Sequence, residues 1–215
     1  MKNILIIAIA SSFVLSNVFA QSFMSNTVSE CKMEAFEIDR IWFAMNRISD
    51  AYNVRICSEF PYAYKTPKWP KTNMTFTNET FGNVFGTLMQ ATTNLVWRYE
   101  NNTDSIYVYP STNSITQMRI GPIPLTNEPV WKIFFDDEME TMKIDGLDLG
   151  GRESDSWNML ITLDMGESYL WEVIDAAMMQ IPDMISWDIR EILPQEGSRY
   201  ILRYFTKQHA YLGYY

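Results

Sequence analysis

The amino-acid sequence predicts an α+β protein made of two related modules, each pairing helices with small mixed β-sheets. Three observations predict this fold class. Short apolar runs alternate with polar residues, whereas longer runs place apolar residues three and four positions apart. Residues 74–109 change in this way from strand to helix and back to a hairpin. Residues 159–205 repeat the succession, which indicates a duplicated unit.

Residues 74–109 are the most regular stretch of the chain. Met74–Phe76 predicts a short strand, and a helix with one apolar face follows it. Residues 95–99 return to a period of two, Asn101–Asp104 favours a tight turn, and residues 105–109 complete a hairpin. The aromatic residues on these apolar faces, and one in the repeat, are expected to be core: Phe81, Phe85, Trp97 and Trp187.

The preceding segment predicts a strand at residues 28–33, a helix and a second strand at residues 54–58. An apolar stripe starting at Ile38 predicts that the helix ends near Tyr52–Asn53. Three prolines then withhold backbone donors and predict an irregular loop. The loop carries three aromatic side chains: Tyr62, Tyr64 and Trp69.

The second half of the chain is expected to repeat the first after a connection. Residues 111–157 predict a linker and an acidic, glycine-rich loop, with a short helix near residues 128–135. A strand, a helix and two strands follow. Gln180 and Trp187 lie 90 positions after Gln90 and Trp97, so the spacing from helix to tryptophan is kept.

Four segments are therefore expected along the chain. Residues 1–20 form a signal peptide, residues 21–110 a first domain, residues 111–157 the connection, and residues 158–215 a second, partial module with an aromatic tail. The signal peptide has a basic Lys2, a short apolar core and small residues at Val18 and Ala20, which predicts cleavage after Ala20. No transmembrane segment is expected in the mature chain, which would be periplasmic or secreted.

Composition excludes several partner classes. The chain has 215 residues and is 47% hydrophobic, which argues against disorder. Its net charge is -9, and removal of Lys2 with the signal peptide brings it to about -10. An acidic protein of this kind lacks the clustered Lys and Arg that nucleic acid or anionic lipid requires.

The first half resembles the short N-terminal domain (STN) that bacterial secretins share with TonB-dependent signal-transducing receptors. Two stretches within residues 27–110 carry the resemblance: residues 36–42 leading to Tyr52–Ile56, and Met74–Phe76 leading through a helix to Leu95–Tyr99. A weaker second match covers residues 158–205. The resemblance implies a module of β-α-β-β-α-β-β type without enzymatic activity, which docks onto other proteins of the cell envelope.

Two departures from the family limit what the resemblance implies. A secretin continues into a membrane channel and a receptor into a plug and barrel, whereas this sequence stops after the second match. The proline-rich loop that carries Trp69 also exceeds the usual short connection of such a domain. Pore formation and iron uptake are therefore not expected.

No residue pattern supports catalysis, a cofactor or a metal. His209 is the only histidine and has no organised partners, so we interpret it as a surface residue. Ser154 and Ser156 lack a strand-turn-helix elbow. The acidic loop fails the EF-hand spacing, and we interpret its carboxylates as solvated: Asp145, Asp148, Glu153 and Asp155.

Two cysteines leave two alternatives open. Cys31 and Cys57 are an even count in an exported protein, which favours a disulfide. Cys31 shares an apolar strand side with Met33, however, whereas Cys57 alternates with charged residues, which favours two separate thiols.

The sequence thus predicts a non-enzymatic, exported binding or assembly protein of the bacterial envelope, with an unidentified protein partner and the capacity to form oligomers. The alternative is a secreted ligand- or glycan-binding protein that uses Tyr62, Tyr64 and Trp69.

Overall fold

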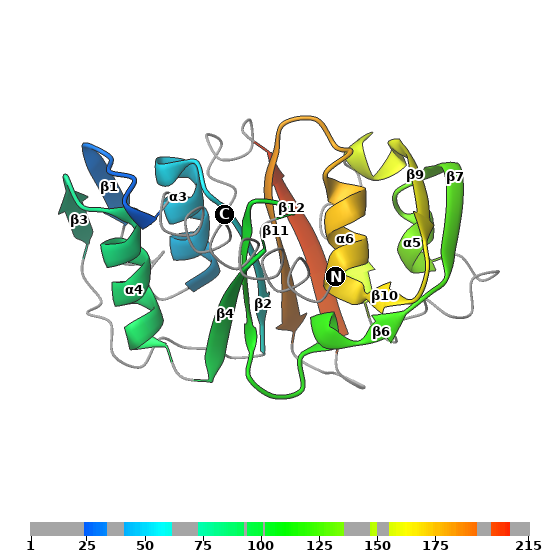
Figure 1. The fold of residues 1–215 in the computed structure, drawn as a ribbon, viewed down its shortest axis with the longest axis horizontal. Helices are drawn as coiled ribbons and strands as arrows, with labels where there is room; N and C mark the ends of the chain where they lie inside the picture. The colour runs from blue at the N-terminus through cyan, green and yellow to red at the C-terminus, as the bar shows by residue number, and fades with distance from the viewer. Residues whose placement is uncertain are drawn as a thin grey trace, which may run out of the picture. The chain divides into compact units, whose positions relative to one another are not determined.

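The described residues form both helices and strands, which confirms the α+β class (Figure 1). The computed structural model describes residues 24–33, 41–61, 73–92, 94–100, 102–135, 147–149, 155–192 and 199–206. Contacts divide the chain into two compact units. The first comprises residues 1–55, 65–93 and 97–107, and the second comprises residues 56–64, 94–96 and 108–215.

The first unit packs two helices beside a strand pair. Strand β1 (Glu30–Met33) pairs antiparallel with β3 (Met74–Thr77). Helices α3 (Ile41–Tyr52) and α4 (Phe81–Ala91) lie side by side next to it (Figure 1). Their facing sides are apolar and fully buried, as the helical spacing predicted. The buried residues are Ile41, Met45 and Ile48 in α3, and Phe81, Val84, Phe85 and Leu88 in α4.

Helix α3 ends where the sequence predicted. Asn53 adopts a left-handed conformation with φ 50°, which asparagine tolerates better than most residues. Its N–H donates to the Asp50 carbonyl, and the Val54 N–H donates to the Ser49 carbonyl. This pair of bonds is a Schellman motif, which satisfies carbonyls at the end of the helix and turns the chain into the next strand.

The start of α4 is fixed by a cap and by the N-terminal segment. The Thr80 hydroxyl accepts a hydrogen bond from the Asn83 N–H, as an N-cap residue does. The Phe81 N–H donates to the Asn26 carbonyl at 2.8 Å. Gly82 lies so close to Met24 that an added Cβ would be 3.1 Å from the Met24 carbonyl oxygen. The segment before β1 therefore packs directly on the first turn of α4.

The second unit places helix α6 (Leu170–Met178) between two antiparallel strand pairs (Figure 1). Strand β11 (Met184–Ile192) pairs with β12 (Arg199–Thr206) on one side. On the other side β7 (Ile123–Pro129) pairs with β9 (Leu160–Met165). Short elements complete the unit: the 3₁₀ helices η1 (Ile115–Gln117) and η3 (Asp155–Asn158), helix α5 (Lys132–Phe135), and the paired strands β6 (Arg119–Ile120) and β10 (Ser168–Tyr169).

One six-stranded sheet has the strand order β4-β5-β2-β11-β12-β8. Its remaining strands are β4 (Leu95–Glu100), β5 (Ser105–Pro110), β2 (Arg55–Phe60) and β8 (Leu147–Leu149). Strand β2 runs parallel to β11, and β12 runs parallel to β8. Strands β2, β4 and β5 each contribute residues to both units.

The order of elements repeats along the chain. The first series is β1-α3-β2-β3-α4-β4-β5, and the second is β7-α5-β8-β9-α6-β11-β12 with the short elements η3 and β10 added before and after β9. The pairing repeats as well, because β1 pairs with β3 as β7 pairs with β9. In the sheet, the order β4-β5-β2 is followed by β11-β12-β8. We call these two series the first and second modules.

Equivalent contacts occur at equivalent positions of the two modules. In the first module the ring of Phe85 on α4 meets the ring of Trp97 on β4, with centroids 5.5 Å apart. In the second module Asp175 on α6 accepts a hydrogen bond from the indole of Trp187 on β11 at 3.1 Å. Each residue lies 90 positions from its counterpart, which is the spacing noted in the sequence.

The described part of residues 111–157 contains strands where a linker was expected. Ile123 and Leu125 are buried in β7, residues 128–129 end that strand, and the expected short helix begins only at Lys132. Pro122 and Pro124 obscured the alternation in the sequence. Proline is tolerated on an edge strand, and β7 has a partner on one side only, namely β9. The second module accordingly begins before residue 158.

None of the helices in the described ranges has the length and apolar character needed to cross a membrane. The expected signal peptide at residues 1–20 lies outside the described residues.

Two glycines of α4 test the packing of the N-terminal segment. Alanine at Gly86 meets no atom within 4 Å, so Gly86→Ala should raise the free energy of unfolding by about 0.5–1 kcal/mol through helix propensity. Gly82→Ala should give less than half of that gain, because its Cβ presses on the Met24 carbonyl at 3.1 Å. Urea denaturation measures both, and equal gains would contradict the packing of residues 24–29 on α4.

Candidate functional site

The two modules are joined in the sheet by the parallel pairing of β2 with β11. Ser58 lies opposite Asp188, Glu59 opposite Ile189 and Phe60 opposite Arg190. Residues 56–60 of β2 are all buried, so both faces of the strand are covered. The described chain places three buried carboxylates around this junction, one each on β2, α6 and β11: Glu59, Asp175 and Asp188.

On one face of the junction, Asp175 binds groups from both joined strands. Its Oδ1 accepts a hydrogen bond from the Trp187 indole of β11 at 3.1 Å. The Cys57 thiol of β2 donates to the same oxygen at 3.9 Å. A buried carboxylate is costly unless it is hydrogen-bonded, so these contacts tie α6 to both strands.

Glu59 binds the segment that starts η1. Its carboxylate accepts hydrogen bonds from the backbone N–H groups of Ile115 at 2.9 Å and Thr116 at 3.0 Å. The hydroxyls of Ser114 at 2.6 Å and Thr116 at 2.7 Å also donate to it. Each hydrogen bond to a charged group contributes on the order of 1.5–3 kcal/mol. The four bonds hold residues 114–116 against β2.

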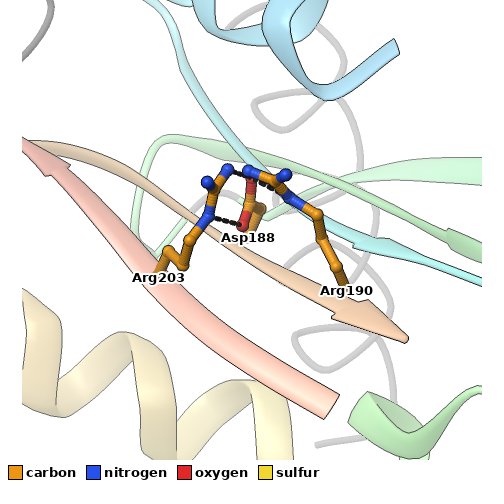
Figure 2. A network of polar contacts seen from close by, with 3 residues as sticks. All are labelled: Asp188, Arg190 and Arg203. Atoms are coloured by element: carbon orange, nitrogen blue, oxygen red, sulfur yellow. Dashed lines mark hydrogen bonds and ion pairs between the residues drawn. The ribbon is translucent and has the colours of Figure 1, made fainter. Parts of the chain in front are cut away.

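On the other face, Asp188 lies between two arginines (Figure 2). Arg203 of β12 donates to both carboxylate oxygens, from Nε at 3.1 Å and from Nη2 at 2.9 Å. Arg190, two residues along β11, donates from Nε at 3.2 Å. Asp188 is 1% exposed, whereas the side chains of Arg190 and Arg203 are 16% and 29% exposed. A bidentate pair of this geometry fixes the relative position of two neighbouring strands.

Burial governs the protonation of Asp188. It raises the pKa of the carboxyl to about 6 from the ordinary 3.8, against the charge and hydrogen bonds of Arg203, which lower the pKa. Both oxygens of this carboxyl group are nevertheless buried and accept hydrogen bonds from protein side chains. The arrangement therefore suits a structural role better than general acid–base chemistry, which needs contact with a substrate.

A different kind of site is present at the end of the sheet, on β4. The residues described outside β4 include no strand paired with its outer edge. The Ser111 N–H donates to the Asn94 carbonyl at 2.8 Å, so in an alternating antiparallel ladder the N–H and C=O groups of residues 95, 97 and 99 point away from β5. Val96 is 37% and Trp97 is 40% exposed on this strand. An edge with exposed apolar side chains is a surface for strand addition.

Trp97 therefore differs from the expectation that it is core. Its ring does meet the buried Phe85, but two fifths of its surface is exposed. The other three aromatic residues expected in the core, Phe81, Phe85 and Trp187, are buried. The indole of Trp187 is bound by Asp175 of α6, and β11 has a neighbour on each side, whereas β4 has a partner on one side only within the described sheet.

Most residues that the sequence singled out cannot be placed at either site. The aromatic loop residues Tyr62, Tyr64 and Trp69 lie outside the described residues. The same holds for Asp145, Glu153, Ser154, His209 and the cleavage position Ala20. The described residues contain no group of three or more His, Cys, Asp or Glu side chains arranged to hold a metal ion.

The two cysteines are both buried thiols in the structure. Cys31 lies on the buried side of β1 with Met33, as predicted. Cys57 was predicted on a charged strand side, but that side of β2 is also buried, because Glu59 binds residues 114–116. A disulfide between them under oxidising conditions stays a prediction.

Sequence reasoning missed the charged residues of the junction. Asp175 lies on the apolar face of α6, between Ile174 and Ala177, and an acidic residue at such a position is a sign of a buried hydrogen-bonded group. Asp188 and Arg203 lie in two predicted strands and were not singled out. Their pairing follows only from the hairpin register, in which they lie opposite each other.

No family model matches the chain, and no curated protein or solved structure is significantly similar to it.

The raised pKa of Asp188 predicts a pH-dependent contribution to stability. Between about pH 4 and pH 6 the folded chain binds a proton at Asp188 that the unfolded chain does not. The contribution is fully present below the unfolded value of 3.8 and is lost as the pH rises through about 6. The gap between these values corresponds to about 3 kcal/mol.

Wild type and Asp188→Asn, unfolded with urea at several pH values, test this. The free energy of unfolding of the wild type should rise relative to that of the variant by about 2–3 kcal/mol as the pH falls from about 7 to about 4. Groups common to both proteins cancel in this difference. A difference that stays constant with pH would show that Asp188 is not held in the buried network.

Proposed function

We propose that this chain is an exported, non-enzymatic binding or assembly protein of the bacterial cell envelope, made of two STN-like modules and acting in the periplasm or after secretion. The pattern of residues 1–20 supports export, because it has the charge, the apolar core and the small residues that signal peptidase requires. The proposal assigns the protein a partner protein and no reaction.

The repeated order of elements supports the two modules. Each has the β-α-β-β-α-β-β succession that the resemblance implies, and each pairs its first strand with its third. In an STN domain such small sheets and helices dock onto other envelope proteins. The kinship rests on this succession and on the 90-residue spacing of the tryptophans.

One observation carries the binding role, namely the exposed edge of β4. Backbone groups of residues 95, 97 and 99 point away from β5, and Val96 and Trp97 expose apolar surface beside them. Natural edge strands are usually protected by charged side chains, proline or a bulge. Residues 95–100 carry the charged Arg98 and Glu100 but neither lysine nor proline, and Val96 and Trp97 stay exposed between them and the start of the strand. An added strand from another protein would pair along this edge and cover the two side chains.

Site-specific photo-cross-linking in living bacteria tests the proposal. A photoreactive amino acid replaces Val96 on β4 or, as a matched control, Leu160, an exposed apolar residue of β9. Position 96 should yield protein adducts in the envelope fraction that position 160 does not yield. The recovered chain should begin at Gln21, after loss of residues 1–20.

Two outcomes would contradict the proposed function. One is retention of the uncleaved chain in the cytoplasm, which would exclude an envelope role. The other is an equal yield of adducts at positions 96 and 160, which would show that the β4 edge has no selective partner.

A further inference from the structure

Among the described strands, two members of the sheet lack the neighbour that their counterparts have. At the junction β2 of the first module pairs with β11 of the second. The counterpart of β2 is β8, and the counterpart of β11 is β4, by their places in the two series. These two strands are the ends of the described sheet, β4 at one end and β8 at the other.

We propose that β8 of one copy pairs in parallel with β4 of a second copy, repeating between molecules the β2–β11 pairing found within one. This inference rests on the proposed assembly function and names its partner, a second copy of the chain. The precedent is on the same molecule, because the β2–β11 contact shows that a strand at this module position accepts a parallel neighbour from the next module.

The repeat also fixes the register of the proposed contact. Within the chain, Ser58 lies opposite Asp188 and Glu59 opposite Ile189. Adding 90 to the β2 positions gives β8, and subtracting 90 from the β11 positions gives β4. Asp148 of one copy then lies opposite Arg98 of the next, and Leu149 lies opposite Tyr99. Arg98 already forms an ion pair with Glu100 of the same strand at 3.1 Å, so the register follows from the repeat and not from a new charge pair.

Burial at the counterpart positions supports an occupant for β4. Ser186 and Trp187 of β11, the strand that pairs with β2 at residues 188–190, are each 1% exposed. Their counterparts Val96 and Trp97 of β4 are 37% and 40% exposed. A strand placed beside β4 as β2 is placed beside β11 would cover this apolar surface and pair the outward backbone groups.

The contact joins two different strands, so the assembly is head-to-tail. Such a heterologous contact leaves β8 open at one end and β4 at the other, and further copies can add. The expected products are a ring or a chain of copies. A symmetric pairing of β4 with β4 would instead stop at a dimer.

Cysteine cross-linking of the mature full chain tests both the partner and the register. Arg98→Cys and Asp148→Cys place thiols opposite each other across parallel strands about 4.8 Å apart, within the reach of a disulfide. The native Cys31 and Cys57 are buried, and the parent chain under the same oxidation is the control for them. The two single variants are oxidised separately and mixed, and the double variant is oxidised alone.

The proposal expects a covalent dimer only when the two single variants are mixed, and a ladder of higher multimers from the double variant. Dimers from Arg98→Cys alone would show symmetric β4 pairing and overturn the proposal. No dimer in the mixture would also overturn it. Circular dichroism establishes that each variant retains the fold.

Sedimentation equilibrium of the unmodified chain gives a result that does not depend on any variant. A mass that rises with concentration beyond that of a dimer supports head-to-tail assembly, and a monomer at every concentration overturns it. This measurement also separates the two proposals. If the chain is monomeric but position 96 forms adducts with a different envelope protein, the proposed function is supported and self-assembly is overturned.

Discussion

The parallel pairing of β2 with β11 is the constraint on which the rest of the sheet depends. More than a hundred residues separate the two strands in sequence, so no local turn brings them together. Without this pairing the described strands would divide into β4-β5-β2 and β11-β12-β8. Each group is the three-stranded sheet of one module, and the pairing joins them into one sheet.

The buried carboxylates explain how such a junction is specified. Hydrophobic burial alone tolerates slippage between strands, whereas a carboxylate surrounded by directed donors accepts one register. Asp175 accepts hydrogen bonds from Cys57 of β2 and Trp187 of β11, the two joined strands. Glu59 fixes β2 to residues 114–116 through four hydrogen bonds, and Asp188 fixes β11 to β12 through Arg203. Burying these charges is costly, and the pKa of about 6 at Asp188 reflects that cost. The junction therefore gains specificity more than stability.

The duplication was visible in the sequence only where hydrophobic periodicity is strong. Trp97 and Trp187 mark equivalent strands, and the helix before each was predicted with its apolar face. The end of α3 at Asn53 was also predictable, because a polar residue that tolerates the left-handed conformation follows the apolar stripe. Local patterns of this kind depend on a few neighbouring residues.

The parts that were not predicted depend on contacts between distant segments. Strand β7 was mistaken for a linker, because Pro124 interrupts its alternation and only the pairing with β9 shows that it is a strand. Glu59 and Asp188 were not singled out in the sequence, since most of their donors lie in other parts of the chain. The exposure of Trp97 follows from its place at the edge of the sheet, which periodicity cannot indicate.

Backbone NOE spectroscopy of the mature chain tests the joining of the two modules most directly. Parallel pairing predicts interstrand NOEs between Ser58 and Asp188 and between Glu59 and Ile189, together with slow amide exchange along β2. The absence of these NOEs, with ¹⁵N relaxation showing residues 95–110 and 184–206 tumbling independently, would contradict the account.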